Sequence, residues 1–213
     1  MKCFLIEQTD VRRVTASTTW GTCPKDPWAA YGKPEHRAQI IRFEGPAQQA
    51  RERYEDKDLV WTPFHAVCNY CGEDGGIQAT TSTGMHSIWR RADTGETRDR
   101  PDDFGVGAMY YADWECSERP LDAQGRKLWG WDWDNQFEPP LYVITPGGPW
   151  CIDSRASNCT LKEDRMHRCW VRHGTPPNIH VDKAGVTCRA GAGSIICGKY
   201  HGFLHGGSLT NSL

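Results

Sequence analysis

The sequence has no long apolar run, and its charges nearly balance. No segment approaches the roughly 18 consecutive apolar residues that a membrane-spanning helix needs, and the apolar stretch CFLI at 3–6 is too short for a secretory signal. With 25 Lys and Arg against 27 Asp and Glu, the net charge of −2 gives no general attraction to nucleic acid or to anionic lipid. We therefore expect a cytoplasmic protein that does not associate with membranes and has no general affinity for nucleic acid.

Internal repeats and low-complexity tracts are also missing, so the chain offers few boundaries between domains. The clearest change lies near residue 140, because residues 141–213 contain eight Lys and Arg, only four Asp and Glu, and five of the eight His. This distribution predicts an N-terminal α+β region over 1–140 and a C-terminal β region over 141–213.

Long helical patterns are scarce, and the 22 Gly and 13 Pro predict many turns. The only segment with helical composition is 47–58, while residues 105–116 fit either a short helix or an irregular aromatic segment. The three alternating tryptophans at 129–133 fit an edge strand or hairpin. Short apolar or β-branched segments between turns predict strands, at 3–6, 38–43, 85–91, 141–144, 150–153, 167–171, 178–182, 194–197, 202–204 and 208–210. We therefore expect a mainly β (α+β), loop-rich fold with short-stranded sheets and few short helices.

The ten cysteines are better explained by metal binding or core packing than by disulfides, which are rare in the cytoplasm. Cys68 and Cys71 have the Cys-x2-Cys spacing followed by glycine, which brings two thiolates together in a tight turn and is typical of zinc sites. One such turn supplies half of a tetrahedral site. The remaining ligands could be His65, Cys3, Cys23 or Cys116, and the alternative is that the two cysteines simply lie at a bend.

A second group of possible zinc ligands lies in the last third of the chain. It consists of Cys159, His167, Cys169, His173 and Cys188. If HRCWVRH is a strand, His167, Cys169 and His173 lie on one face of it, and three or four of the five groups could hold zinc. Alternatively, Cys169 packs as a small apolar residue while the histidines bond to the backbone.

Near the end of the chain, the stretch AGAGSIICGKYHGF could form a hydrolytic site. Ser194 would be the nucleophile and His201 its general base, with Asp153 or Asp182 as the orienting acid. The N–H groups near Gly191 and Gly193 could hold an oxyanion. The stretch differs from the G-x-S-x-G elbow of α/β-hydrolases, and glycine turns near a histidine also occur in ordinary β domains.

Segments along most of the chain resemble a family of proteins from actinobacteria and their phages. They are CFLIE, RFEG, CNYCG, WRRADTGE, GAMYYADW, PGGPWCIDSRASNCT, HRCWVRHGTPP, VDKAGVTCRAGAGSI and YHGF. The resemblance implies a phage or prophage origin, with a location in the host cytoplasm or the virion.

The C-terminal motif also resembles the BubE-like peptidases encoded beside bacterial ubiquitin-like proteins. Ser194 in GSI and His201 in YHGF match the serine and histidine of these peptidases, and the Cys68–Cys71 turn matches their upstream cysteine-rich segment in order. The chain has AG where the family has PS, and it has no serine before the histidine. The resemblance implies a peptidase that cleaves peptide or isopeptide bonds at the end of a ubiquitin-like protein.

Three functions remain open at this point. The first is a zinc-stabilised Ser/His hydrolase with a peptide or protein substrate. The second is a non-enzymatic phage protein that serves in virion structure or binds a host protein. The third is a metal-dependent nuclease, which is suggested by the density of histidine and cysteine and by the basic C-terminal third. The oligomeric state is open in all three.

Overall fold

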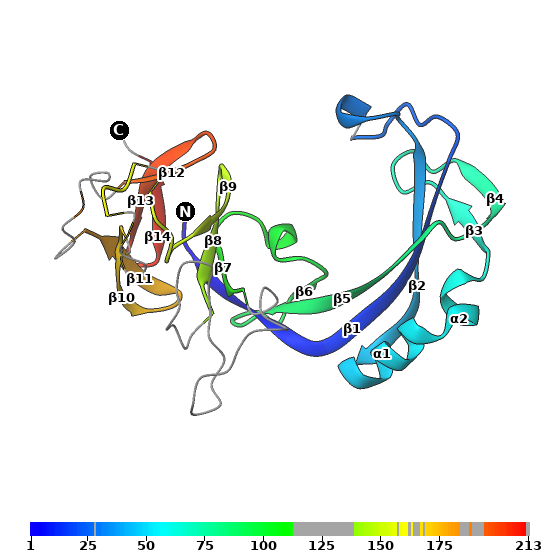
Figure 1. Ribbon diagram of the computed structural model, residues 1–213, viewed down its shortest axis with the longest axis horizontal. Coiled ribbons are helices and arrows are strands. Elements are labelled where there is room, and N and C mark those ends of the chain that lie inside the picture. The colour runs from blue at the N-terminus through cyan, green and yellow to red at the C-terminus, as the bar shows by residue number, and fades with distance from the viewer. Residues whose placement is uncertain are drawn as a thin grey trace. The chain divides into compact units, whose positions relative to one another are not determined.

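The computed structural model describes residues 1–27, 29–112, 139–156, 158–161, 163, 167, 169–183, 188 and 194–211. The chain forms two compact units, which we call the central unit (Gln8–Ile88) and the terminal unit (Met1–Glu7 and Trp89–Leu213). The fold is mainly β with short sheets and few short helices, which confirms the expected class (Figure 1). The predicted division at residue 140 falls within the terminal unit, and the tryptophans at 129–133 lie outside the described residues.

The central unit is built on two long antiparallel strands. Strand β1 (Phe4–Trp20) pairs with β2 (His36–Pro46), from Val11 opposite Pro46 to Trp20 opposite His36. The turn helix η1 (Ala29–Tyr31) lies in the connection between them. Only residues 3–6 of β1 were expected as a strand. The extension to residue 20 includes the β-branched sequence VTASTT, which suits a pleated strand.

Two short helices follow β2, where the sequence predicted one. They are α1 (Ala47–Glu55) and α2 (Lys57–Trp61), and Asp56 separates them because its carboxylate accepts a hydrogen bond from the Leu59 N–H at 3.1 Å, which caps α2. No helix in the described part of the chain is long and apolar enough to cross a membrane.

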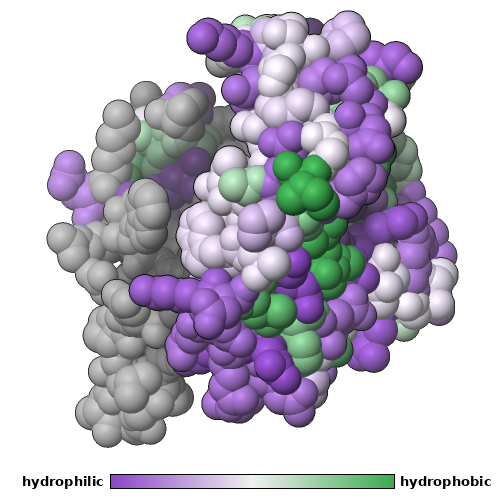
Figure 2. Space-filling view, turned by 90° about the vertical axis from the view of Figure 1, so that its right-hand side faces the viewer, coloured by the Kyte–Doolittle hydropathy of each residue, from purple (hydrophilic) through white to green (hydrophobic). Residues whose placement is uncertain are grey.

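The hairpin of β3 (Phe64–Val67) and β4 (Asp74–Gln78) packs against the β1–β2 pair through Phe64 and Ala66. The chain then continues into β5 (Ser82–Arg91). The buried contacts here are few and small, and they involve Ala16, Ala38, Phe64 and Ala66. The face of the molecule in Figure 2 is mostly hydrophilic, with a strip of hydrophobic residues near the middle of the view. Such a small core is a weak source of stability.

In the terminal unit, the start of β1 pairs in parallel with β7 (Ala108–Tyr111), since Phe4 lies opposite Ala108. Antiparallel strands β8 (Leu141–Thr145) and β9 (Gly148–Cys151) continue this sheet. The short strand β6 (Thr97–Arg98) pairs with the end of β5, and the turn helix η2 (Pro101–Phe104) follows it. Residues 108–111 therefore form a buried strand, and both alternatives predicted from the sequence, a helix and an irregular segment, are wrong there.

The last part of the terminal unit consists of two small antiparallel sheets. One is the hairpin of β10 (Val171–Thr175) and β11 (Asn178–Asp182), and the other has the order β12 (Ile195–Cys197), β13 (Tyr200–His205) and β14 (Ser208–Asn211). The Gly207 N–H donates to the Ile179 carbonyl at 2.9 Å and so joins the β13–β14 turn to β11. The prediction of a strand over 167–171 is wrong, because β10 begins only at Val171 and residues 169–170 form a bend.

Candidate metal centres and a serine–histidine pair

Four potential metal ligands converge in the central unit. This first Cys3His group consists of Cys23, His36, Cys68 and Cys71, whose ligand atoms all lie within 4.8 Å of one another. Cys23 follows the end of β1, and His36 begins β2 directly opposite Trp20. The long β1–β2 pairing therefore brings together two ligands that are 13 positions apart in the chain.

The other two ligands lie in the turn after β3. The Gly72 N–H donates to the Cys68 carbonyl at 2.9 Å, and Gly72 has a φ of +79°, a conformation that favours glycine. The Asn69 N–H donates to the Arg37 carbonyl at 2.8 Å, which fixes this turn against β2 next to His36. The backbone thus orients both cysteines of the turn toward the ligands supplied by β1 and β2.

Within the first group, the Cys23 and Cys68 sulfurs lie 3.8 Å apart, and the Cys71 sulfur lies 3.3 Å from His36 Nδ1. Cys23 and Cys68 form no disulfide, since all the cysteines of this group are free. Cys23, His36 and Cys68 are almost completely buried. The other ring nitrogen of His36, Nε2, lies 3.2 Å from the Glu73 carboxylate, and the Trp20 indole stacks on the imidazole at 5.4 Å between ring centroids.

The protonation of these thiols is linked. Burial raises the pKa of Cys68, but hydrogen bonds from the backbone N–H groups of Tyr70 and Cys71 outweigh this effect and bring the pKa to about 5. Burial raises the pKa of Cys23 to about 11. Ionisation of Cys68 is therefore favoured, while ionisation of Cys23 beside it is disfavoured. A bound cation would favour ionisation of both thiols by compensating their negative charges.

Substitution of Glu73 by glutamine is expected to weaken metal binding at the first group about 10- to 100-fold, because a carboxylate on the outer nitrogen of a ligating histidine orients the ring and raises its basicity. Competition with a chromogenic chelator measures the affinity. Asp74→Asn is the matched control, since Asp74 is the next residue and pairs with His65, which lies outside the group. Equal affinities for the two variants would show that Glu73 does not support His36.

A second Cys3His group lies in the terminal unit. It consists of Cys159, His167, Cys169 and Cys188, again with all ligand atoms within 4.8 Å of one another. The three cysteines are buried and belong to the main core cluster of this unit. These four residues come from irregular segments, so here the chain between the strands supplies the whole group.

In the second group, the Cys169 and Cys188 sulfurs lie 3.6 Å apart, and the Cys169 sulfur lies 3.7 Å from His167 Nε2. Burial raises the pKa of Cys169 to about 11. The Lys183 ammonium donates to the Cys188 sulfur at 3.3 Å and to the Cys169 carbonyl at 3.1 Å. The Leu161 N–H donates to the Cys159 sulfur at 3.4 Å. These donors favour negatively charged sulfur.

Of the eleven candidate metal ligands named from the sequence, seven belong to the two groups. The exposed His65 instead pairs with Asp74 at 2.8 Å, and His173 lies on β10, where it contacts Asp182 at 3.1 Å. His173 does not belong to the second group because residues 169–170 form a bend. His167, Cys169 and His173 therefore do not lie along one face of a continuous strand, as a strand over HRCWVRH would have required. Among the other candidates for the first group, Cys23 is a member, Cys3 is in the core of the terminal unit, and Cys116 lies outside the described residues.

Sequence reasoning missed His36. It precedes the expected strand at 38–43 by two residues, and it becomes a ligand only through the register of β2 against β1. A search for a histidine at the start of a strand that pairs with the strand before Cys23 would have found it.

The expected serine–histidine pair is in contact. Ser194 Oγ and His201 Nε2 lie 3.0 Å apart, where β12 and β13 run side by side with Ile196 opposite His201. His201 is exposed and Ser194 is partly exposed. The antiparallel register explains the contact, because it folds the residue before β12 back to the start of β13.

The other expected members of this site are placed differently. Asp153 is buried, and its Oδ2 accepts hydrogen bonds from the Leu141 N–H at 3.0 Å and from the Arg172 guanidinium at 3.4 Å. Asp182 lies between two histidines, His173 and His180. Gly191 and Gly193, the expected oxyanion loop, lie outside the described residues.

No protein-family model, curated protein or solved structure matches this chain. The geometry of the two Cys3His groups and of the serine–histidine pair is therefore the basis for the functional argument.

Proposed function

We propose that the protein is a zinc protein with two structural ions, one in each Cys3His group. The convergence of four ligands in each unit supports this proposal most strongly. In a tetrahedral site with Zn–S near 2.3 Å and Zn–N near 2.0 Å, two sulfurs lie about 3.8 Å apart and a sulfur and a nitrogen about 3.5 Å apart. The sulfur–sulfur distances of 3.8 and 3.6 Å and the sulfur–nitrogen distances of 3.3 and 3.7 Å fit this geometry.

The ligand set also favours a structural role for zinc over a catalytic one. Catalytic zinc usually has three protein ligands and an open position for water, whereas four protein ligands fill a tetrahedral site. Each group has four, and each is mostly buried. This arrangement speaks against the nuclease alternative at these two centres, because such an enzyme needs an open coordination position.

Metal analysis combined with cobalt substitution tests this proposal. We expect two zinc ions per chain, and a cobalt form with the strong sulfur-to-metal absorption bands of tetrahedral thiolate sites. Cys23→Ser and Cys169→Ser should each remove one ion, while Cys197→Ser, outside both groups, should remove none. Fewer than two ions in the wild type, or no loss in the first two variants, would contradict the proposal.

A second proposed function is hydrolysis by Ser194 with His201 as its base, and the 3.0 Å contact between them supports it. His201 would take the serine proton as Ser194 attacks an acyl carbonyl, and would then donate that proton to the leaving group. The resemblance to BubE-like peptidases suggests a peptide or ubiquitin-like protein as substrate. The alternative is a non-enzymatic phage protein that uses the same face to bind a partner.

Labelling with a fluorophosphonate separates these two alternatives. For the hydrolase we expect a single adduct by intact mass, and at least a 100-fold slower reaction in Ser194→Ala and in His201→Gln. Ser208→Ala is the matched control, because Ser208 lies on β14 of the same sheet. Equal labelling of all these proteins, or none in the wild type, would favour the non-enzymatic alternative.

A further inference from the structure

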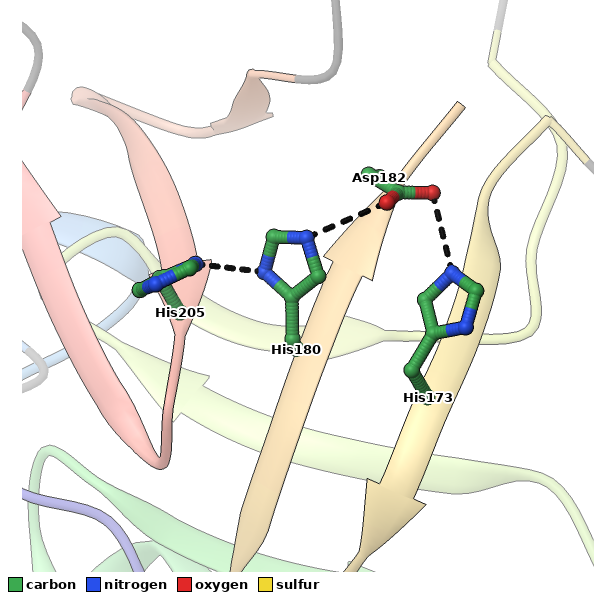
Figure 3. A network of polar contacts seen from close by, with 4 residues as sticks. All are labelled: His173, His180, Asp182 and His205. Carbon is green, nitrogen blue, oxygen red and sulfur yellow. Dashed lines mark hydrogen bonds and ion pairs between the residues drawn. The ribbon is translucent and has the colours of Figure 1, made fainter. Parts of the chain in front are cut away.

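Three histidines and an aspartate form a continuous polar network on the terminal unit, apart from both Cys3His groups (Figure 3). His173 and His180 lie opposite each other on β10 and β11, and each contacts one carboxylate oxygen of Asp182 at 3.1 Å. On the other side of the His180 ring, Nδ1 lies 2.6 Å from Nδ1 of His205 on β13. We propose that His180 and His205 form an exposed binding site for a divalent transition-metal ion such as Ni²⁺ or Zn²⁺.

The protonation of His180 follows from its neighbour. An ionised carboxylate only accepts hydrogen bonds, so His180 Nε2 carries the proton and donates it to Asp182. In neutral His180 the lone pair is then on Nδ1, which points toward His205. A carboxylate on the outer nitrogen of a ligating histidine is the usual support for a metal ligand. Asp182 is therefore a positioning residue, and the proposed ligands are the two Nδ1 atoms.

The separation of these nitrogens suits a shared ion after a small adjustment. With metal–nitrogen bonds of 2.0–2.1 Å, two ligands lie about 3.3 Å apart on a tetrahedral ion and about 3 Å apart at a right angle. The observed 2.6 Å is somewhat shorter, and the rings are nearly perpendicular at 83°. Because both rings are on the surface, rotation of their side chains can open this gap without disturbing the core.

The backbone holds the two ligands near each other although they come from different sheets. The Gly207 N–H donates to the Ile179 carbonyl, next to His180. The Gly207 carbonyl accepts a hydrogen bond from the backbone N–H of Cys3 at 2.7 Å. A Cβ at Gly207 would lie 2.8 Å from the Pro177 carbonyl oxygen, so the β13–β14 turn and the β10–β11 turn are in close contact here. Sites on strands fixed in this way are more precise than sites on loops.

The site differs from the Cys3His groups in accessibility. The side chains of His180 and Asp182 are 37% and 34% exposed, and His205 is exposed. An ion held by two imidazoles keeps its remaining positions for water or another ligand. Nitrogen ligands favour nickel, copper and zinc over magnesium or calcium. We therefore expect weaker and reversible binding, in contrast to buried thiolate centres.

Calorimetric titration with Ni²⁺ tests the proposal, with untagged protein as purified. The wild type should bind one nickel ion, and His180→Ala and His205→Ala should each weaken binding at least tenfold. Asp182→Asn should weaken it about 10- to 100-fold through the lost support of His180. The matched control is His65→Ala, which removes an exposed histidine that also pairs with an aspartate, in the central unit.

The zinc content of each protein is measured before the titration, so failure of the Cys3His proposal is recognised separately from failure of this one. All four substituted side chains are at the surface, and an unchanged circular dichroism spectrum shows that each variant is folded. If the wild type takes up no nickel, or if His180→Ala and His205→Ala bind it as the wild type does, the two histidines form a hydrogen bond only and the proposal is wrong.

Discussion

Removing the proposed zinc ions with a chelator is expected to unfold the protein. The apparent binding free energy of structural zinc is about 10–16 kcal/mol at neutral pH, as large as the total stability of a typical domain, about 5–15 kcal/mol. We expect the central unit to depend most on its ion, because the buried cluster around Phe64 otherwise contains mainly alanines. We expect the near-ultraviolet circular dichroism and the cooperative thermal transition to disappear when chelation is complete, and to return when zinc is restored.

The same prediction can be made for each unit separately. Cys23→Ser should expose amides of residues 8–88 to hydrogen exchange, while Cys169→Ser should expose those of the terminal unit, because each group connects segments of one unit only. Cys197→Ser is the control for thiol loss outside both groups. A thermal midpoint that stays unchanged after complete metal removal would show that the ions do not stabilise either unit.

The fold class could be predicted from composition and local pattern, since the turns and short β-branched segments specify strands whatever their neighbours are. Strands β8, β11 and β14 lie close to where they were expected. The misses are segments whose structure is decided by pairing. Residues 108–111 form a strand because they pair with both β1 and β8, a contact that no local pattern reveals.

Among the residues of the candidate sites, too, some could be predicted from local sequence and others are brought into place only by strand pairing. The Cys68–Cys71 turn is a local motif, so its spacing was sufficient to predict two ligands. His36 depends on the register of two long strands. His65, one of the four candidates for the remaining ligands, is exposed and pairs with Asp74 instead. The contact between Ser194 and His201 depends on a hairpin that folds β12 back against β13, and this hairpin is present. The pair of His180 and His205 was not expected, because its partners come from different sheets.

Gly147→Ala is expected to destabilise the terminal unit by about 3 kcal/mol, at the upper end of the usual cost of overpacking. A Cβ at Gly147 would lie 1.7 Å from the Cys197 carbonyl oxygen, which is backbone and cannot rotate away. The contact is reciprocal, because a Cβ at Gly198 would lie 2.6 Å from the Gly147 carbonyl oxygen. The β8–β9 turn and the β12–β13 turn therefore meet through two glycines, and a side chain at Gly147 must separate them.

Chemical denaturation measures this effect, with Gly32→Ala as the matched control. A Cβ at Gly32 meets nothing within 4 Å, so this substitution should change the free energy of unfolding by no more than about 1 kcal/mol. Displacement of β12 should also disturb the contact between Ser194 and His201, which depends on the register of β12 with β13. The chemical shifts of the His201 ring should then change in Gly147→Ala and stay as in the wild type in Gly32→Ala. Equal stability of the two variants would mean that the β8–β9 and β12–β13 turns are not in backbone contact, and the position of the serine–histidine pair would then depend on β12 and β13 alone.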